Sequence, residues 1–259
     1  MSRMTDRLSD NQKIIELAKQ DYETKRHSKI PPNIVPIPSK GLIYPESHPL
    51  RSGTVEMRHM TAYDEDILSN STYLKQGVAL EKLLEALVIT PGISVQDIAW
   101  CDQEAMLISA RIFGYGDEYK LMVTDPTSKK SIEKTIQLSK IGFLPFNLEP
   151  NEHGEFEYTT KSDDVLKFRF LNSKQIQSIS QENSVSKLLE LAIREVNGNR
   201  DANDIKDFIK YEFRAIDSKQ FRDYFIENIP GMDFDLTFEG EDGSTFKSRF
   251  QFGSDFFWF

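Results

Sequence analysis

The same order of predicted elements occurs twice in this chain of 259 residues, and this repetition limits the possible folds more than any other feature. In each copy, a short strand is followed by helices and then by two strands around a turn. The stretch VLKFRFLNSKQIQSI at 165–179 matches TVEMRHMTAYDEDIL at 54–68 in this order. Lys-Leu-Leu-Glu is identical in both copies, at 82–85 and 187–190. The sequence therefore predicts two related lobes.

Hydrophobic spacing predicts the elements within each copy. TVEMRHM alternates apolar and polar residues as a half-buried strand does, and the leucines of YLKQGVALEKLLEALVI follow helical spacing. Thr61 and Asp64 have the spacing of a helix N-cap pair. A second helix is predicted in CDQEAMLISARIFGYG, with Asp102 as its cap and Gly114 and Gly116 as its stop.

Each copy closes with a predicted β-hairpin. EYKLMVTD and IEKTIQLS flank the first turn, and DFDLTFEGEDGSTFKSRFQFG contains the second hairpin. Helices and antiparallel hairpins together predict an α+β fold of two related lobes, each made of a strand, helices and a hairpin, from an internal duplication. We expect the first repeat at residues 36–145 and the second repeat, with the aromatic C-terminus, at residues 146–259.

Residues 1–35 are predicted to form an N-terminal arm that is flexible or becomes ordered on a partner. Ile14, Ile15 and Leu17 lie in its short apolar stripe, which makes them candidates for partner binding. The stretch that follows, IPPNIVPIPSKGLIYPESHPL, contains six prolines. Because proline fixes φ and removes a donor, this stretch predicts an extended segment on the surface.

Charge and cysteine content exclude several classes of protein. The formal net charge of −9 opposes binding to nucleic acid or to an anionic membrane, since both attract lysine and arginine. Cys101 is the only cysteine, so an intrachain disulfide is impossible, and we expect a reducing, cytosolic environment. We expect neither a signal peptide nor a membrane span, because no apolar run approaches the roughly 20 residues that a span requires.

The sequence offers no pattern that predicts an enzyme. The four histidines, His27, His48, His59 and His153, do not have the spacing of a metal site. Cys101 precedes a predicted helix, where a thiolate is stabilised, but a single cysteine beside a tryptophan is more often part of a core. We expect no catalytic residues and no cofactor.

Both hairpin turns carry oxygen-bearing residues at matching positions. Asp125 and Ser128 lie in the first turn, and Glu239 and Asp242 in the second. Four such residues are a possible cation site, although hairpin turns use Asp, Gly and Ser for backbone reasons alone.

The chain closes with an aromatic run. Phe256, Phe257, Trp258 and Phe259 either fill the chain's own core or remain exposed as an anchor for a partner. These four residues are therefore candidates for partner binding.

In several of its motifs the chain resembles the baseplate protein family of T-even-type contractile-tailed phages, the family that includes the hub-assembly protein. The matching residues include IPSKGLIYP at 37–45, VEMRHMTAYDEDIL, PGISVQDIAWCDQEAMLISARIFGYGDEY, IENIPGMDFDLTF and the final DFFW. In many relatives the two turns carry Cys-x-x-Cys pairs that resemble a split zinc ribbon. Here these cysteines fall on Asp125, Ser128, Glu239 and Asp242, and oxygen ligands do not replace thiolates in structural zinc sites, so no metal is expected.

The resemblance implies a tail morphogenesis protein of the bacteriophage that binds proteins during baseplate hub assembly. It is expected to act as an assembly factor or chaperone in the host cytoplasm, or as a hub subunit in the virion baseplate. Other hub proteins and the tape-measure protein are its implied partners. The alternative is a degenerate zinc-ribbon-like module that binds metal or nucleic acid.

Overall fold

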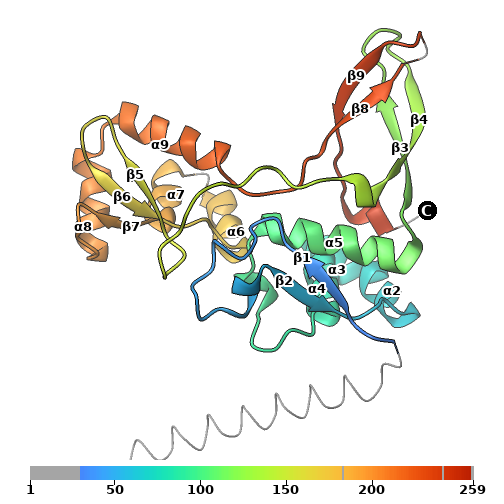
Figure 1. The fold of residues 1–259 in the computed structure, drawn as a ribbon, viewed down its shortest axis with the longest axis horizontal. Helices are drawn as coiled ribbons and strands as arrows, with labels where there is room; N and C mark the ends of the chain where they lie inside the picture. The colour runs from blue at the N-terminus through green and yellow to red at the C-terminus, as the bar shows by residue number, and fades with distance from the viewer. Residues whose placement is uncertain (1–29, 183, 241, 258–259) are drawn as a thin grey trace, which may run out of the picture.

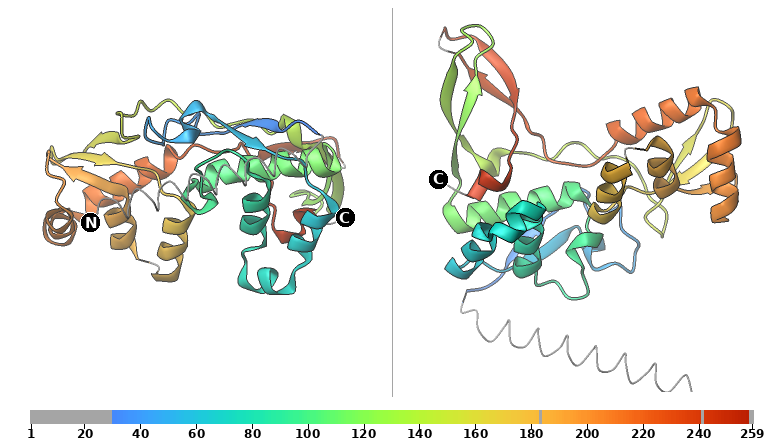
Figure 2. Two further views of the ribbon diagram at one scale, coloured as in Figure 1. Left: turned by 90° about the horizontal axis from the view of Figure 1, so that it is seen from below. Right: turned by 180° about the vertical axis from the view of Figure 1, so that it is seen from behind.

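The computed structural model describes residues 30–182, 184–240 and 242–257. They form an α+β fold with three parts (Figure 1). Residues 33–115 form a first lobe and residues 156–227 form a second lobe. The two β-hairpins lie together as a third part, the hairpin pair, at the end of the first lobe opposite to the second lobe (Figure 2). Within the described residues, no helix combines the length and the apolar character needed to cross a membrane.

The first lobe packs a two-stranded sheet against helices. Its elements are β1 (Asn33–Pro36), β2 (Thr54–Met57), α2 (Ala62–Ser69), α3 (Ser71–Gln76), α4 (Ala79–Leu87) and α5 (Trp100–Tyr115). β1 and β2 are antiparallel, and Met57 at the end of β2 forms an antiparallel bridge with Val88, just after α4. Thr61 and Asp64 form the predicted capping box at the start of α2. The leucines whose spacing predicted α4 form its buried face.

The second lobe also has two strands followed by helices, with an additional strand, a short helix and a π-helical turn before its last helix. Its elements are β5 (Phe156–Thr159), β6 (Val165–Phe168), α6 (Ser173–Glu182), α7 (Val185–Ala192), β7 (Ile193–Val196), α8 (Ala202–Asp207), a π-helical turn (Phe208–Glu212) and α9 (Ala215–Glu227). β5 and β6 are antiparallel, and Phe168 at the end of β6 pairs with Ile193, just after α7. Asn172 and Gln175 exchange hydrogen bonds of 3.1 and 2.9 Å at the start of α6, where the first lobe has its capping box.

Both hairpins extend beyond the lobes and lie side by side (Figures 1 and 2). They are β3 (Glu118–Thr124) with β4 (Ser131–Gln137), and β8 (Asp235–Glu239) with β9 (Thr245–Arg249). The segments that connect the lobes run antiparallel: the Leu144 N–H donates to the Gly231 carbonyl and the Asp233 N–H donates to the Gly142 carbonyl, both at 2.8 Å. These paired segments return the second hairpin to the first lobe.

The second hairpin lies beside the first hairpin and not against the helices of its own repeat (Figure 1). Aromatic packing is the physical reason. The rings of Phe250 and Phe256, which follow β9, lie with centroids 5.6 and 5.1 Å from that of Tyr119 on β3. The apolar surface of this hairpin is thus buried against the first hairpin and not against α9.

The proline-rich segment was predicted to be an extended chain on the surface, but the structure places much of it in the core. β1 begins at Asn33, inside the predicted arm of residues 1–35, and Val35 is buried. Ile37, Ile43 and Tyr44 are buried as well. The prolines prevent helix formation, but the apolar side chains between them draw the segment into the core of the first lobe.

Candidate protein-binding site

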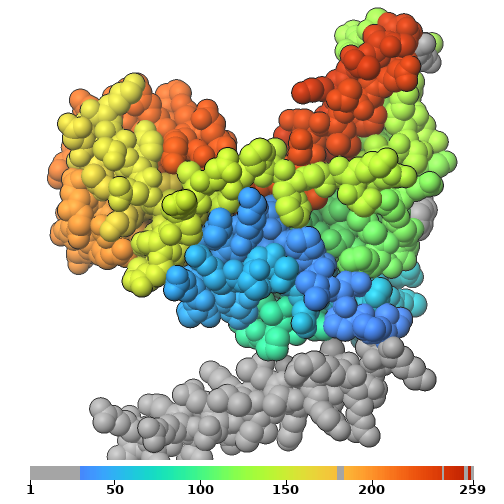
Figure 3. All heavy atoms as spheres, in the orientation of Figure 1, coloured from blue at the N-terminus to red at the C-terminus, as the bar shows by residue number. Residues whose placement is uncertain are grey.

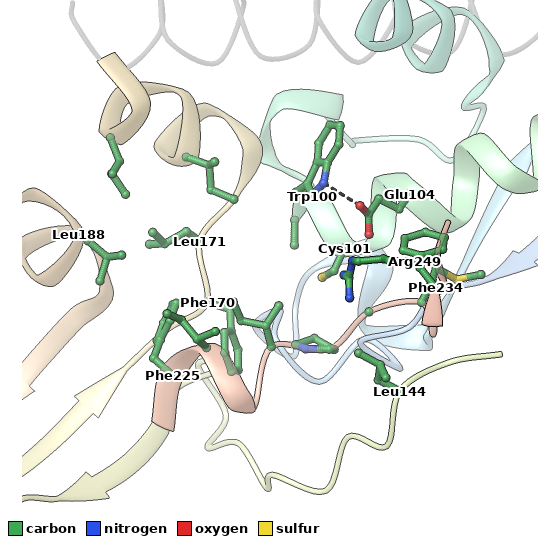
Figure 4. A pocket seen from close by; sticks show the side chains of 18 residues that line it. Trp100, Cys101, Glu104, Leu144, Phe170, Leu171, Leu188, Phe225, Phe234 and Arg249 are labelled. Atoms are coloured by element: carbon green, nitrogen blue, oxygen red, sulfur yellow. Dashed lines mark hydrogen bonds between the residues drawn. The ribbon is translucent and has the colours of Figure 1, made fainter. Parts of the chain in front are cut away.

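An apolar groove lies between the two lobes, and we call it the interlobe groove (Figure 4). Trp100 and Cys101 at the start of α5 line one side, and Leu188 of α7 with Phe225 of α9 line the other. Leu144 of the connecting segment closes its edge. The volume of about 470 Å³ is within the range of ligand-binding clefts. In the space-filling view, the second lobe and the hairpin pair stand apart on either side of the connecting segments (Figure 3).

Apolar side chains of the groove remain open to solvent. Ile226 is 62% exposed, Trp100 44%, Ile176 and Ile229 39% each, and Leu144 38%. Single exposed apolar residues are ordinary on a protein surface, but a contiguous apolar patch indicates an interaction site.

Two charged side chains interrupt this apolar lining. The Trp100 Nε1 donates a hydrogen bond of 2.9 Å to Glu104 Oε1, and Arg249 lies nearby on β9 (Figure 4). Burial raises the pKa of Glu104, and the hydrogen bond from Trp100 and the charge of Arg249 oppose this rise. An apolar surface with few polar groups is the composition of a protein or peptide docking site.

A buried carboxylate fixes the helix that presents Trp100. Asp102 is the third residue of α5 and accepts hydrogen bonds from the Ser39 N–H at 3.0 Å, the Ser39 hydroxyl at 2.7 Å and the Tyr44 hydroxyl at 2.7 Å. The Tyr44 oxygen accepts from the Ala99 N–H at 3.1 Å. Burial raises the pKa of Asp102, and these hydrogen bonds oppose the rise. Because α5 begins at Trp100, Asp102 is not the predicted cap; it joins the strand connection to the start of the helix.

The IPSKGLIYP motif has a structural explanation in this contact. It supplies both Ser39 and Tyr44 to Asp102, and it contains Gly41 with a φ of +77°. A Cβ on Gly41 would lie 2.5 Å from the carbonyl oxygens of Leu50 and Arg51. Only glycine fits at this position.

The second lobe has a carboxylate in the corresponding place. Asp217 is the third residue of α9 and accepts from the Ser162 hydroxyl at 2.6 Å and from Arg214 Nε at 2.8 Å. Ser162 lies between β5 and β6, as Ser39 lies between β1 and β2. The hydrogen bonds from Arg214 and Ser162 lower the pKa of Asp217.

The aromatic C-terminus lies partly in the core. Phe256 and Phe257 are 0% and 1% exposed, and the Phe256 carbonyl accepts from Arg111 Nε at 3.3 Å. The self-docked alternative describes these two residues, which present no surface to a partner in this structure. Trp258 and Phe259 lie outside the described residues, so their role stays a prediction.

The four predicted ribbon positions lie at the tips of the two hairpins. Asp125 and Asp242 accept hydrogen bonds from backbone N–H groups of their own turns, at 2.7 and 2.9 Å, while Ser128 lies in the first turn and Glu239 ends β8. A Cβ on Gly240 would lie 3.1 Å from a carboxylate oxygen of each aspartate, so the tips face each other. Among the described residues, no three or more His, Cys, Asp or Glu side chains are grouped to hold a metal ion.

Sequence reasoning missed the interlobe groove. The predicted candidates Ile14, Ile15, Leu17, Trp258 and Phe259 lie outside the described residues, and none of the described candidates lines the groove. A signal was present in α9, where Phe221 and Phe225 form the buried stripe and Ile226 falls outside it.

The structure thus combines an α+β fold with an exposed apolar groove between two lobes. The family model described as T4 bacteriophage base plate protein matches residues 43–258. The chain belongs to this family, which confirms the resemblance seen in its motifs and gives it a role connected with the phage base plate. No curated protein matches the chain, and no solved structure does.

Proposed function

We propose that this chain is a non-enzymatic protein of phage tail morphogenesis that binds other proteins during assembly of the base plate hub. Family membership gives the base plate setting. The observation that supports binding most directly is the interlobe groove, whose apolar side chains come from both lobes and remain exposed.

The shape and composition of the groove favour an amphipathic helix as the bound element. Such helices place apolar residues at positions i, i+3, i+4 and i+7 into apolar grooves. The tape-measure protein, a long helical ruler with apolar stripes, is our proposed partner, by analogy with other tail chaperones. Trp100 and Ile226 face this ligand from opposite lobes, so binding also fixes the lobes relative to each other.

The protein acts in this proposal either as a transient assembly factor in the host cytoplasm or as a subunit that stays in the virion. Mass spectrometry of purified virions separates these roles. A subunit is present at structural copy number, and a chaperone is absent.

We also propose that the two lobes arose by internal duplication. Three matching features support it. First, the chain after α4 forms a bridge with the end of β2, and β7 after α7 pairs with the end of β6. Second, α2 and α6 both begin with a capping box. Third, a serine from a strand connection donates a hydrogen bond to the third residue of α5 and of α9. A chance resemblance in element order does not require these matched contacts.

Co-expression with the tape-measure and hub proteins tests the binding function. Ile226→Asp places a charge in the groove and is expected to abolish co-purification, because a buried unpaired charge is costly. The matched control is Tyr63→Asp on α2, 76% exposed and outside the groove lining, which is expected to leave co-purification unchanged. Equal retention of partners by both variants would contradict the proposal.

The alternative function is a degenerate zinc-ribbon-like module that binds metal or nucleic acid through the hairpin tips. The facing turns of Asp125 and Asp242 are the observation that favours it. Stoichiometric zinc in elemental analysis of the purified protein would support this alternative over ours.

A further inference from the structure

The interlobe groove contains a carboxylate that forms no ion pair within the described chain. Of the 18 residues that line the groove, only Glu104 and Arg249 are charged (Figure 4). Arg249 has a partner on its own hairpin, because its Nη1 lies 3.4 Å from Oδ1 of Asp235, its cross-strand neighbour on β8. No lysine, arginine or histidine among the residues that the structure describes lies within ion-pairing distance of Glu104. Glu104 is therefore the charge in the groove that remains for a ligand.

Trp100 holds this carboxylate at the wall of the groove. The two residues lie at positions i and i+4 of α5, so they share one face of the helix. The Trp100 Nε1 donates its hydrogen bond of 2.9 Å to Glu104 Oε1 (Figure 4). Glu104 Oε2 has no donor among the described residues and is not buried, so a ligand can reach it. Because the face of an indole ring attracts cations, the ring and the carboxylate together form a receptor for a cationic side chain.

We propose that the groove binds an amphipathic helix of another protein that carries a lysine or an arginine beside its apolar stripe, and that Glu104 and Trp100 select this basic residue. The apolar stripe contacts the wall formed by Leu188, Phe225 and Ile226, while the basic side chain points to α5. The proposal deepens the function proposed above, because it assigns a charge to the partner at the same site and therefore rests on that function.

Desolvation makes this selection stringent. Burial already raises the pKa of Glu104, and a helix that covers the groove removes more of the water around this carboxylate. A helix without a cation at this point leaves the carboxylate unpaired in apolar surroundings, which is costly. A helix with a lysine or an arginine replaces the lost water by an ion pair, and the methylene groups of its side chain pack on the Trp100 ring. The groove therefore discriminates against uncharged helices as well as attracting basic ones.

The wider charge distribution also favours a basic partner. The chain has a formal net charge of −9, so it attracts basic segments at longer range. Among the 18 lining residues, Arg249 is the one that attracts an acidic partner, and its pair with Asp235 offsets its charge. The side chains of this pair are 60% and 57% exposed, so water and salt screen Arg249 more strongly than the half-buried Glu104.

Binding of designed peptides to the full chain tests the selection. Three helical peptides of about 18 residues share one stripe of leucines at positions i, i+3, i+4 and i+7, and their flanking positions are all lysine, all glutamine or all glutamate. Fluorescence anisotropy measures the affinity of each labelled peptide at about 0.15 M salt. We expect the lysine peptide to bind about tenfold more tightly than the glutamine peptide, and the glutamate peptide to bind most weakly.

Variants of the chain separate Glu104 from the general attraction to an acidic protein. Glu104→Gln keeps an acceptor for Trp100 and removes the charge, so the ratio of lysine to glutamine affinity is expected to fall from about tenfold to about twofold. The matched control is Glu157→Gln, at an exposed residue of β5 outside the groove lining, which removes the same charge and is expected to keep the ratio near tenfold. Glu104→Lys is expected to reverse the preference, so that the glutamate peptide binds more tightly than the lysine peptide.

Equal affinities of the parent chain for the lysine and glutamine peptides would overturn the proposal without any variant, and so would a ratio that Glu104→Gln leaves unchanged. A preference for the glutamate peptide that Arg249→Gln removes would assign recognition to the arginine and to an acidic partner, which also overturns it. In these cases the peptides still bind, so the function of the groove stands while its selection of a basic partner fails. If none of the three peptides binds the parent chain, the groove does not accept a helix, and the helix-binding function fails together with this inference.

Discussion

Both lobes place a buried carboxylate at the same point of the fold, but the pKa of this carboxylate is raised in the first lobe and lowered in the second. Asp102 meets only hydroxyl and amide donors, and burial raises its pKa. Asp217 meets Arg214 in addition to a serine hydroxyl, and its pKa is lowered. The shared backbone arrangement decides where the carboxyl lies, while burial raises the pKa of Asp102 and the hydrogen bonds from Arg214 and Ser162 lower that of Asp217.

The variant with the largest expected effect tests whether the stability of the first lobe depends on its packing against the hairpin pair. Phe256→Ala is expected to lower the free energy of unfolding by about 3–5 kcal/mol, since the ring is fully buried and its removal leaves a cavity. Urea unfolding measures this loss. Phe246→Ala, on the partly exposed side of β9, is the control and is expected to cost less. Equal losses for the two variants would contradict the expectation that the burial of Phe256 makes it the more important residue.

Removal of the two carboxylates compares the lobes directly. Asp102→Ala leaves the buried donors of Ser39 and Tyr44 without an acceptor, and is expected to cost about 3 kcal/mol. Asp217→Ala is expected to cost less, because the side chain of Arg214 is 59% exposed and can be solvated. Chemical denaturation of both variants gives the ranking, and a larger loss for Asp217→Ala would reverse our comparison.

Titration sharpens the same comparison, because the two carboxyls should shift stability in opposite directions with pH. The folded pKa of Asp102 is raised above its ordinary 3.8, so its stabilising contribution is full below pH 3.8 and is lost as pH rises through the raised value. The folded pKa of Asp217 is lowered below 3.8, so its contribution is present above pH 3.8 and is lost as pH falls through the lowered value. Stability curves of Asp102→Asn and Asp217→Asn against the parent chain should diverge with opposite slopes.

The smallest expected effect concerns the serines. Ser39→Ala, at a fully buried residue, is expected to cost about 1 kcal/mol, and Ser162→Ala, at an exposed residue, a few tenths of that. A thermal unfolding series detects the difference. Identical shifts in melting temperature would indicate that burial does not distinguish the two contacts.

Local patterns predicted most helices and hairpins because their causes lie within a few residues. The leucine spacing of α4, the Thr61–Asp64 box and the glycine stop at Gly116 are local features, and all are present. The strands β1 and β5 were missed, and in β1 the proline Pro36 is unusual in a strand. The start of α5 was misplaced because the sequence alone does not distinguish an aspartate buried in the first turn of a helix from an aspartate that caps it.

Contacts between distant parts of the chain were beyond such patterns. The return of the second hairpin to the first lobe depends on Phe250 and Phe256 meeting Tyr119, which is more than a hundred residues earlier. The groove likewise depends on how far the connecting segments hold the lobes apart. The sequence contains Ile226 and Ile229 as apolar residues, but only the arrangement of the lobes shows that they line the same groove as Trp100.

The contact of the Phe256 carbonyl with Arg111 spans 145 positions of the chain. At ribosomal speeds of about 5–20 residues per second, on the order of ten seconds pass between synthesis of the two residues. During that interval the aromatic cluster at the end of α5 is incomplete, because Phe256 has not yet been synthesised. A polypeptide that ends before Phe256 therefore leaves this apolar site uncovered, and exposed apolar surface of this kind promotes aggregation and is bound by chaperones.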